Sequence, residues 1–444
     1  MVKRVIIIGA AGRDFHVFNT RLREDPDRLV VAFLATQLPE IGGRTYPPEL
    51  AGPRYPNGIP IYDRAEKSLS ELAEELGADE AILAYSDLTY EALLAEAYEA
   101  FRAGLDFTLI NPLSTMLEAE KPVISVCAVR TGAGKSSVAR RVARILLEKG
   151  LRPVDVRHPM PYGDLKAQVC QVFRSLDDVD AQKCTIEERE EYEPMLELGV
   201  PVLAGVDYER VLKAAEREGD VIIWDGGNND LPFFRPDLHI VVADPLRPGA
   251  ELSAYPGVLN AMMADVLVVN KVNMAEREAV ETVKRNLRRL NPRAPIIEAE
   301  SLVRVDRPEL IEGRRVLVVE DGPSVTHGDL GFGAGYVAAR QFGAKEIVDP
   351  RPYAVGVIKE AYERYEHIGA VLPTIGYRPG QLRALEETIR ATPCDAVVLG
   401  TLCDLARVIR IDKPVVRVRY DIRELTRPDL ADVIGRFLAE RGLT

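Results

Sequence analysis

The stretch 123–137, VISVCAVRTGAGKSS, decides the fold of this chain. Its first seven residues are apolar or small, which predicts a buried strand over Val123–Val129. A helix is predicted to follow as far as about Lys149, and the glycines between the two let backbone N–H groups converge on phosphate oxygens. Strand, loop, Lys-Ser pair and helix occur in the required order, so we predict the phosphate-binding loop of a nucleoside triphosphatase rather than a turn that binds nothing.

Each position of this loop has an expected role. Lys135 can reach the β- and γ-phosphates of ATP, and the hydroxyl of Ser136 can ligate Mg²⁺. The usual pattern wants glycine at position 129, where this chain has Val. The loop instead resembles the K-G-G-x-G-K-[ST] variant of the MinD, nitrogenase iron protein and dethiobiotin synthetase branch, with Arg130 in place of the signature Lys. The resemblance implies that Arg130 contacts phosphate, often across a homodimer. The remaining expected nucleotide contacts are Thr131, Gly132, Ala133, Gly134 and Ser137.

Two later strand ends support a nucleotide site. The run 221–227, VIIWDGG, ends a predicted buried strand in Asp225, which is suited to hold Mg²⁺ directly or through water. The run 268–273, VVNKVN, resembles the N-K-x-D base-recognition motif of GTPases, with Asn270, Lys271 and Asn273. An amide offers both a donor and an acceptor, which suits adenine better than guanine, so we expect ATP rather than GTP. The alternative is that Asn270 and Lys271 only cap a strand. Ser301, after the next strand, is a weak candidate for a second base-contacting loop.

The run 155–165, DVRHPMPYGDL, is the first candidate for a substrate site, because ligands bind at strand ends in open α/β sheets. Arg157 can clamp a phosphate bidentately, and His158, Tyr162 and Asp164 can orient substrate or exchange protons. The alternative is a surface connection with a satisfied histidine. Asn228, Asn229 and Asp230 are expected on the γ-phosphate side.

Three further segments carry weaker signals. The run 320–328, EDGPSVTHG, is a second phosphate-friendly loop with Ser324, Thr326 and His327 as substrate candidates. The N-terminal turn 9–16, GAAGRDFH, lacks the full G-x-G-x-x-G and is expected either to bind an anion or to form an interface. The run 187–194, EEREEYEP, is predicted to be a solvated helix face.

Short apolar runs alternate with amphipathic stretches almost throughout, which is typical of βα units and parallel sheets. Among the later runs we predict strands over 221–224, 266–269, 296–297, 396–399 and 415–418. We predict an α/β protein of three units: a Rossmann-like domain over residues 1–121, a P-loop domain with a mainly parallel sheet over 122–303, and a C-terminal α/β domain over 304–444. The Pro- and Gly-rich segment 38–60 is predicted to be a long loop.

Composition narrows the functional class. The formal net charge of −12 argues against a nucleic-acid partner. The five cysteines form no C-x-x-C pair, so a reducing, cytoplasmic location is expected. No apolar run approaches the length needed to span a bilayer, so no membrane association is expected. The preference for Glu and Arg hints at a thermophilic source.

Taken together, GAAGRDFHVFN, VRTGAGKSS, VRHPMPYGDL, EREEYEP, DGGNND, NKVN and EDGPSVTHG resemble the cyclic 2,3-diphosphoglycerate synthetase family. The resemblance spans Gly9 to about Asp404 and is most specific in HPMPYGDL and GPSVTHG. It implies an ATP-dependent ligase that closes an intramolecular phosphoanhydride in 2,3-diphosphoglycerate and releases ADP and phosphate. The expected catalytic groups are Lys135, Arg130, Arg157, His158 and Asp225.

Two other readings remain open. One is a regulatory or metallochaperone-like P-loop ATPase or GTPase that changes state on hydrolysis. The other keeps the ligase or kinase chemistry but acts on another small polyanion, because resemblance alone does not fix the substrate.

Overall fold

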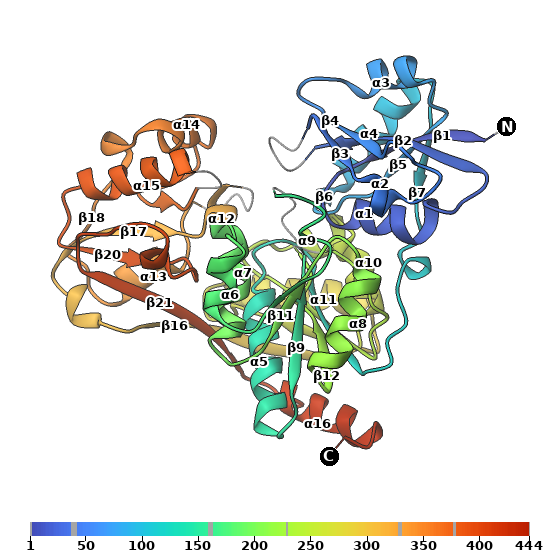
Figure 1. The fold of residues 1–444 in the computed structure, drawn as a ribbon. Helices are drawn as coiled ribbons and strands as arrows, with labels where there is room; N and C mark the ends of the chain where they lie inside the picture. Colours follow the sequence, from blue (N-terminus) through green and yellow to red (C-terminus); the bar gives the residue numbers. More distant parts are fainter. Residues whose placement is uncertain are drawn as a thin grey trace.

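The computed structural model describes residues 2–36, 42–158, 163–227, 230–326, 331–375 and 379–443, without the side chains of Pro323, Ser324 and Pro379. The chain folds into a mixed α/β protein with two large, mainly parallel sheets (Figure 1). In Figure 1 the N-terminal part is blue, the central part runs from cyan through green to yellow, and the C-terminal part is orange and red. No helix in the described ranges is both long and apolar enough to cross a bilayer.

The N-terminal unit is built on a six-stranded sheet in the order β3-β4-β2-β1-β5-β7. Its pairs are parallel except for β3 with β4. The strands are β1 (Lys3–Ile8), β2 (Arg28–Ala35), β3 (Arg44–Tyr46), β4 (Ile59–Asp63), β5 (Glu80–Leu83), β6 (Leu88–Thr89) and β7 (Asp106–Leu109). The helices are α1 (Arg13–Val17), η1 (Phe18–Leu22), α2 (Pro48–Ala51), α3 (Leu69–Leu76), α4 (Tyr90–Arg102) and η2 (Pro112–Ser114). The predicted 38–60 loop is wrong in part, because β3, α2 and the start of β4 lie in it.

The central unit continues the alternation of strands and helices. Its strands are β8 (Val123–Ala128), β9 (Pro153–Arg157), β10 (Gln171–Phe173), β11 (Val202–Ala204), β12 (Val221–Trp224), β13 (Leu238–Ala243), β14 (Ala254–Tyr255), β15 (Val266–Val269) and β16 (Ile296–Val305). Its helices are α5 (Lys135–Glu148), α6 (Leu176–Ala181), α7 (Ile186–Leu196), α8 (Tyr208–Glu218), α9 (Ala250–Ser253), α10 (Gly257–Met263) and α11 (Arg277–Leu290). The short strand β14 pairs with β6 and so ties this unit to the N-terminal one.

The C-terminal unit extends the central sheet. The order is β10-β11-β9-β12-β8-β13-β15-β16-β21-β20-β17-β18, with β19 beside β17. Its strands are β17 (Arg315–Glu320), β18 (Glu346–Ile347), β19 (Leu372–Pro373), β20 (Ala396–Leu399) and β21 (Val415–Glu424). Its helices are η3 (Pro308–Leu310), α12 (Gly322–Thr326), α13 (Ala334–Gln341), η4 (Arg351–Tyr353), α14 (Gly356–Arg364), α15 (Pro379–Ala391), η5 (Leu405–Arg407) and α16 (Leu430–Glu440).

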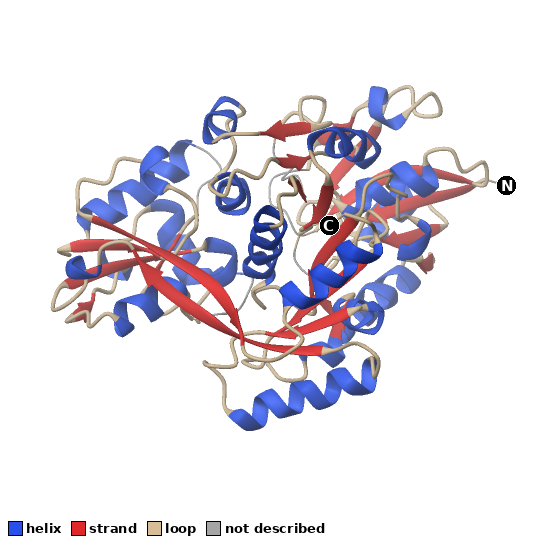
Figure 2. Cartoon of the chain, turned by 90° about the horizontal axis from the view of Figure 1, so that it is seen from below, coloured by secondary structure: helices blue, strands red, loops and turns tan. Residues whose placement is uncertain are grey.

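Two long antiparallel strands, β16 and β21, join the central and C-terminal parts (Figure 2). They pair from Ala299 opposite Glu424 to Val305 opposite Val418. Arg423 lies opposite Glu300 and forms an ion pair with it, so opposite charges meet across the ladder. The division into three units at 121 and 303 stays a prediction, because one sheet runs through the second boundary.

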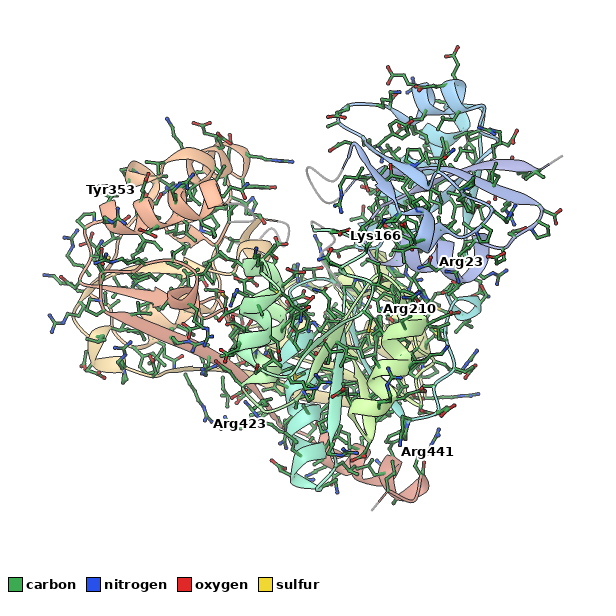
Figure 3. The ribbon with its side chains drawn as sticks, in the orientation of Figure 1. Arg23, Lys166, Arg210, Tyr353, Arg423 and Arg441 are labelled. Carbon is green, nitrogen blue, oxygen red and sulfur yellow. The ribbon has the colours of Figure 1, made fainter. Side chains whose placement is uncertain are left out.

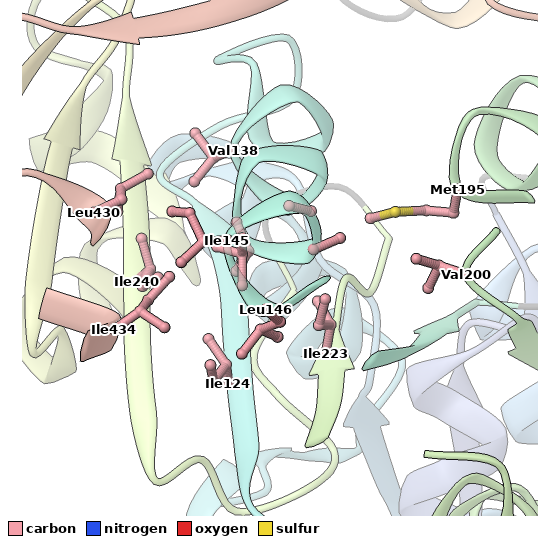
Figure 4. Packing of buried hydrophobic residues seen from close by; sticks show 14 of the residues in the cluster. Ile124, Val138, Ile145, Leu146, Met195, Val200, Ile223, Ile240, Leu430 and Ile434 are labelled. Carbon is pink, nitrogen blue, oxygen red and sulfur yellow. The ribbon is translucent and has the colours of Figure 1, made fainter. Parts of the chain in front are cut away.

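The core around the P-loop strand explains why β8 lies at the centre. All six residues of β8 are buried, between β12 and β13, as expected for a parallel strand covered on both faces. Helix α5 packs Val138, Ile145 and Leu146 over it, together with Met195 from α7 (Figure 4). Leu430 and Ile434 of α16 complete the same cluster, so the last helix returns to the central unit.

Candidate active site

The P-loop backbone is held by the motif that the sequence assigns to base recognition. The amide nitrogen of Asn270 donates to the carbonyl of Ala133 at 3.0 Å, and the Lys271 ammonium donates to the carbonyl of Gly132 at 2.5 Å. Gly134 adopts a φ of +99°, and a β-carbon there would collide with the Asn270 amide. Asn270 and Lys271 therefore shape the phosphate loop itself, in addition to any contact with a base.

The structure brings three of the predicted catalytic residues together, because Lys135 and Arg157 converge on the carboxylate of Asp225. Asp225 follows β12, the Lys135 ammonium forms an ion pair with its Oδ1, and the Arg157 guanidinium forms one with its Oδ2. All three side chains are at most 10% exposed. Two cations and an acid thus meet beside the phosphate loop, where a triphosphate would take over contacts that Asp225 now makes.

Arg157 has a second acidic partner on α7. Its Nη2 lies 3.0 Å from Oε2 of Glu191. Burial alone would lower the pKa of Arg157, but the charges of Asp225, Glu191 and Asp155 outweigh it and raise that pKa. Arg157 therefore stays charged when buried and can exchange a carboxylate for a phosphate.

Asp155 is a buried carboxylate that the sequence analysis passed over. It lies on β9 and is fully buried, and neither of its oxygens has a hydrogen-bond partner in the described part of the chain. Burial raises its pKa well above the usual range, and the nearby charge of Asp225 adds to the rise. An orphaned carboxylate next to Asp225 fits a cation that arrives with the nucleotide.

The residues present suit Mg²⁺ bound together with a nucleotide. Ser136, half-buried at the start of α5, with Asp225 and Asp155, would supply oxygen ligands. No group of three or more His, Cys, Asp or Glu side chains in the described ranges is arranged to hold a metal by itself. An ion here would take most of its ligands from phosphate and water, which is how Mg²⁺ is usually held at nucleotide sites.

His158 lies between the N-terminal and central units. A β-carbon on either Gly12 or Gly227 would come within 2.8 Å of its Nδ1, and its Nε2 lies 3.6 Å from Oδ2 of Asp230. Burial, with the charge of Arg13 as the next cause, lowers the pKa of His158 to about 3. The imidazole is therefore neutral at physiological pH, which favours the predicted orienting role over proton exchange.

The N-terminal turn forms an interface with this site. The guanidinium of Arg13 forms a buried ion pair with Asp230 and donates to the carbonyl of Leu231 at 2.9 Å. It also lies 5.0 Å from the ring of Phe233, on which His16 stacks at 4.3 Å. Of the two expectations for residues 9–16, the structure thus shows the interface.

Two further contacts join the N-terminal unit to the catalytic loops. The Thr131 hydroxyl donates to Asp87 at 2.6 Å, so the P-loop is bonded directly to that unit. Lys166 lies against it (Figure 3) and forms an ion pair with Glu49 at 2.5 Å. Leu165 is buried in the core of the N-terminal unit.

The solvated helix face predicted for residues 187–194 is wrong. Glu188, Arg189 and Glu193 are buried, because α7 lies between the central and C-terminal units. A capping box with Thr185 begins the helix, and Oε2 of Glu193 accepts from the backbone N–H of Asp404 at 2.6 Å. This acidic helix connects the nucleotide site with the C-terminal unit.

Several other predicted site residues have partners away from the Lys135–Asp225–Arg157 group. The amide of Asn273 donates to the carbonyl of Ser301 and accepts from its N–H, both at 3.0 Å, so both of its faces are used between these two loops. Asp164 is exposed and caps a turn by accepting from the N–H of Lys166. The Thr326 hydroxyl donates within α12, to the carbonyl of Gly322.

The remaining predicted residues keep their status as predictions. Tyr162, Asn228, Asn229 and His327, and the side chain of Ser324, lie outside the described part of the structure. Arg130 is half-buried at the start of the loop, and Ser137 is buried and accepts from Arg140 at 3.1 Å.

The contacts that the sequence analysis missed share one property: they join charges on elements distant in sequence. Asp155 left a signal, since an acid in the middle of a short apolar strand is costly unless it has a role. Asp230 was expected on the γ-phosphate side and instead pairs with Arg13. The partners of Arg13, Glu190 and Glu191 left no signal, because they are known only once distant parts of the chain are packed together.

This geometry defines a mixed α/β protein with a P-loop whose lysine meets an acid at the end of the neighbouring strand. No family model matches the sequence. The chain is 54% identical over 432 residues to arginine synthetase ArcE of Thermococcus kodakarensis, covering 97% of this chain and 96% of that protein. It therefore belongs to the family of that arginine synthetase.

Two more distant relatives are named after the family that the sequence motifs resemble. The cyclic 2,3-diphosphoglycerate synthetase of Rubrobacter xylanophilus is 26% identical over 290 residues, covering 59% of this chain and 64% of that protein. That of Thermococcus sibiricus is 28% identical over 86 residues, or 19% of this chain and 20% of that protein. The predicted synthetase class is thus supported, but the cyclising family is the more remote part of the relationship.

Among solved structures, LpxK from Aquifex aeolicus in complex with ATP matches at 15% identity with a TM-score of 0.43. It covers 78% of this chain and 96% of that one. A likeness this loose carries no argument about substrate or mechanism.

Proposed function

We propose that this protein is an ATP-dependent ligase that forms arginine by joining a nitrogen nucleophile to a ureido amino acid. The observation that carries the proposal is the 54% identity to an arginine synthetase along 97% of the chain. ATP is the expected nucleotide and Mg²⁺ its metal ion, and the protein is expected to act in the cytoplasm.

The chemistry follows from what arginine synthesis needs. Arginine differs from citrulline in having a nitrogen where citrulline has the ureido oxygen, so that oxygen must become a leaving group. Attack of the oxygen on the γ-phosphorus of ATP forms an O–P bond and releases ADP. Ammonia then adds to the carbon, the C–O bond breaks, and phosphate leaves with the oxygen. Citrulline, ammonia and ATP thus give arginine, ADP and phosphate.

The residues of the site suit such a transfer. The Lys135 ammonium and the Arg157 guanidinium neutralise charge on the phosphoryl group during its transfer. The backbone N–H groups of residues 131–134 bind the phosphate oxygens. Neutral His158 holds its position against Gly12 and Gly227 and can orient substrate with one hydrogen bond. Mg²⁺, held through Ser136 and Asp225, would offset the charge of the β- and γ-phosphates.

Formation of cyclic 2,3-diphosphoglycerate is the second candidate, supported by the shared motifs and by 26% identity to a named relative. It uses the same first step, since one substrate phosphate would take the γ-phosphoryl group before the other displaces it. The two reactions differ in the charge that the substrate site must accept. Switch-like hydrolysis by a regulatory NTPase is the third possibility.

The test is a side-by-side assay of purified protein with ATP and Mg²⁺. Citrulline plus ammonium should yield arginine in amino-acid analysis, in step with ADP, and Lys135→Ala serves as the blank. A cyclic pyrophosphate signal in phosphorus NMR with 2,3-diphosphoglycerate would select the second candidate. ATP hydrolysis that ignores both substrates would reject both ligase reactions.

A further inference from the structure

A half-buried acidic pair, Glu190 and Asp321, lies where α7 meets the C-terminal unit. Oε1 of Glu190 accepts hydrogen bonds from the hydroxyls of Thr374 at 2.9 Å and Thr401 at 2.5 Å. Burial raises the pKa of Glu190 well above its usual range, and the charge of Asp321 raises it further. Two carboxyl groups held close together are stabilised by a positive charge between them.

A buried cation with spare bonding capacity lies on the adjacent helix. Arg140 of α5 is 5% exposed, and its Nη2 donates to the Ser137 hydroxyl at 3.1 Å and to the Tyr420 carbonyl at 2.7 Å. Its Nη1 has no hydrogen-bond partner in the described ranges. A buried, unpaired guanidinium nitrogen is costly, so its persistence points to a ligand that bonds it.

Tyr420 on β21 connects the two groups. Its ring lies 5.3 Å from the Arg140 guanidinium. Burial raises the pKa of its phenol, and the charges that act on it next are those of Arg140, Asp321, Glu190 and Glu320. The phenol thus lies within electrostatic range of both the unpaired cation and the acidic pair.

We propose that this junction binds the zwitterionic end of an amino-acid substrate, with Arg140 taking the α-carboxylate and Glu190 with Asp321 taking the α-ammonium group. The inference rests on the proposed amino-acid ligase function and names the substrate site for it. A polyanion such as 2,3-diphosphoglycerate would be repelled by the acidic pair, so the site also distinguishes the two candidate reactions.

The position of the Arg140 guanidinium beside the first turn of α5 places this site near the nucleotide. Its Nη2 donates to the hydroxyl of Ser137, two residues after Lys135, at 3.1 Å. An extended side chain of arginine length is longer than one helical turn, which rises about 5.4 Å. With its α-carboxylate at Arg140, the substrate can therefore present its ureido group near the γ-phosphate held by Lys135.

Calorimetric titration of the full-length protein tests the assignment with three ligands. L-Arginine should bind at least tenfold more tightly than agmatine, which lacks the carboxylate, and than N-acetylarginine, which lacks the ammonium group. Glu190→Gln should weaken arginine at least tenfold but change N-acetylarginine little. Arg140→Met should weaken arginine but change agmatine little.

Controls separate this site from the enzyme's overall activity. Glu197→Gln, the same exchange at an exposed position just after α7, should leave all three affinities unchanged, and ATP affinity reports the fold of each variant. Wild-type protein that does not bind arginine at all would remove the proposed function. Arginine binding with unchanged affinity in both Glu190→Gln and Arg140→Met would overturn the site alone.

Independently, the outer face of α4 carries an unpartnered apolar stripe. Tyr90, Leu94, Tyr98 and Phe101 recur at helical spacing and are 42% to 60% exposed. The exposed ends of the helix are opposite in charge, with Glu91 near its start and Arg102 at its end. We infer that two copies of this chain pair through antiparallel α4 helices, because that arrangement brings Leu94 to Tyr98 and Glu91 to Arg102 across a two-fold axis.

Light scattering after gel filtration tests this pairing. The wild-type chain should be a dimer at micromolar concentration and Leu94→Glu a monomer, while Leu246→Glu on another exposed surface should remain a dimer. Glu91→Arg and Arg102→Glu should each weaken the dimer, and the double exchange should restore it. A monomeric wild-type chain, or a dimeric Leu94→Glu variant, would refute it.

Discussion

Gly134→Ala should remove most of the nucleotide affinity of this protein while leaving the rest of the fold intact. Gly134 has a φ of +99°, and alanine in left-handed backbone costs about 1–2 kcal/mol. The new methyl group also collides with the Asn270 amide, whose hydrogen bond to Ala133 is worth about 1 kcal/mol. The altered loop relieves both costs by leaving this conformation, and ATP binding must restore it, so these costs of about 2–3 kcal/mol correspond to a Kd for ATP raised about 30- to 150-fold.

A second glycine, close to the other end of α5, serves as the control. Gly150, just beyond the end of α5, has a φ of +79°, and a β-carbon there would meet no atom within 4 Å. Gly150→Ala therefore introduces the backbone cost without touching the phosphate loop, so it should lower thermal stability and leave ATP affinity unchanged. Calorimetric titration with ATP and Mg²⁺ measures both variants. A Gly134→Ala protein that binds ATP within threefold of wild type would contradict the argument.

Three shorter predictions follow from other contacts. Lys135→Ala should abolish turnover while thermal unfolding shows a retained fold; appreciable residual activity would contradict its phosphate role. Burial raises the pKa of Asp14 to about 7, so the protonated carboxyl stabilises the folded protein below pH 4 and this stabilisation, at most about 4 kcal/mol, is lost as the pH rises through 7. Asp14→Asn should therefore flatten the fall in Tm between pH 4 and pH 8. An unchanged pH profile of Tm would refute this. Asn273→Asp loses the donor to Ser301 and should lower Tm; if the ATP-to-GTP affinity ratio does not change, Asn273 has no part in base recognition.

The elements around the nucleotide could be predicted because each has a local pattern. The strand predicted over 123–129 is observed as Val123–Ala128, and those over 221–224, 266–269 and 396–399 are observed with the same bounds. Parallel strands buried on both faces appear in the sequence as apolar runs, which is why these four strands could be predicted. Asp225 and Arg157 were expected at strand ends, but the ion pairs that join Asp225 to Lys135 and to Arg157 were not predicted.

The joining strands could not be predicted in full. Strand β16 was expected only over 296–297 and extends to Val305, and β21 was expected over 415–418 and extends to Glu424. Their outer halves are half-exposed and rich in Arg and Glu, so no apolar run marks them. Each of these outer halves is stabilised by pairing with the other strand, as in the ion pair of Glu300 with Arg423. Those two residues are more than a hundred positions apart in the sequence.

The prediction of a solvated face for α7 was wrong for a related reason. The acidic residues of this helix suggest solvent, yet several have partners elsewhere in the chain, such as Arg157 for Glu191, Thr401 for Glu190 and the backbone of Asp404 for the buried Glu193. A charged segment is exposed only when no other part of the protein packs against it. The local composition of a segment does not predict such packing.

The return of α16 to the P-loop helix affects how the chain can mature during synthesis. Leu430, Ile434 and Leu438 belong to the same core as Val138 and Leu146, although about 280 residues separate the two helices. The ribosome must therefore release nearly the whole polypeptide before the hydrophobic side of α5 is covered. Until then part of the apolar side of α5 stays uncovered, so a premature stop shortly before residue 430 should yield an aggregation-prone product.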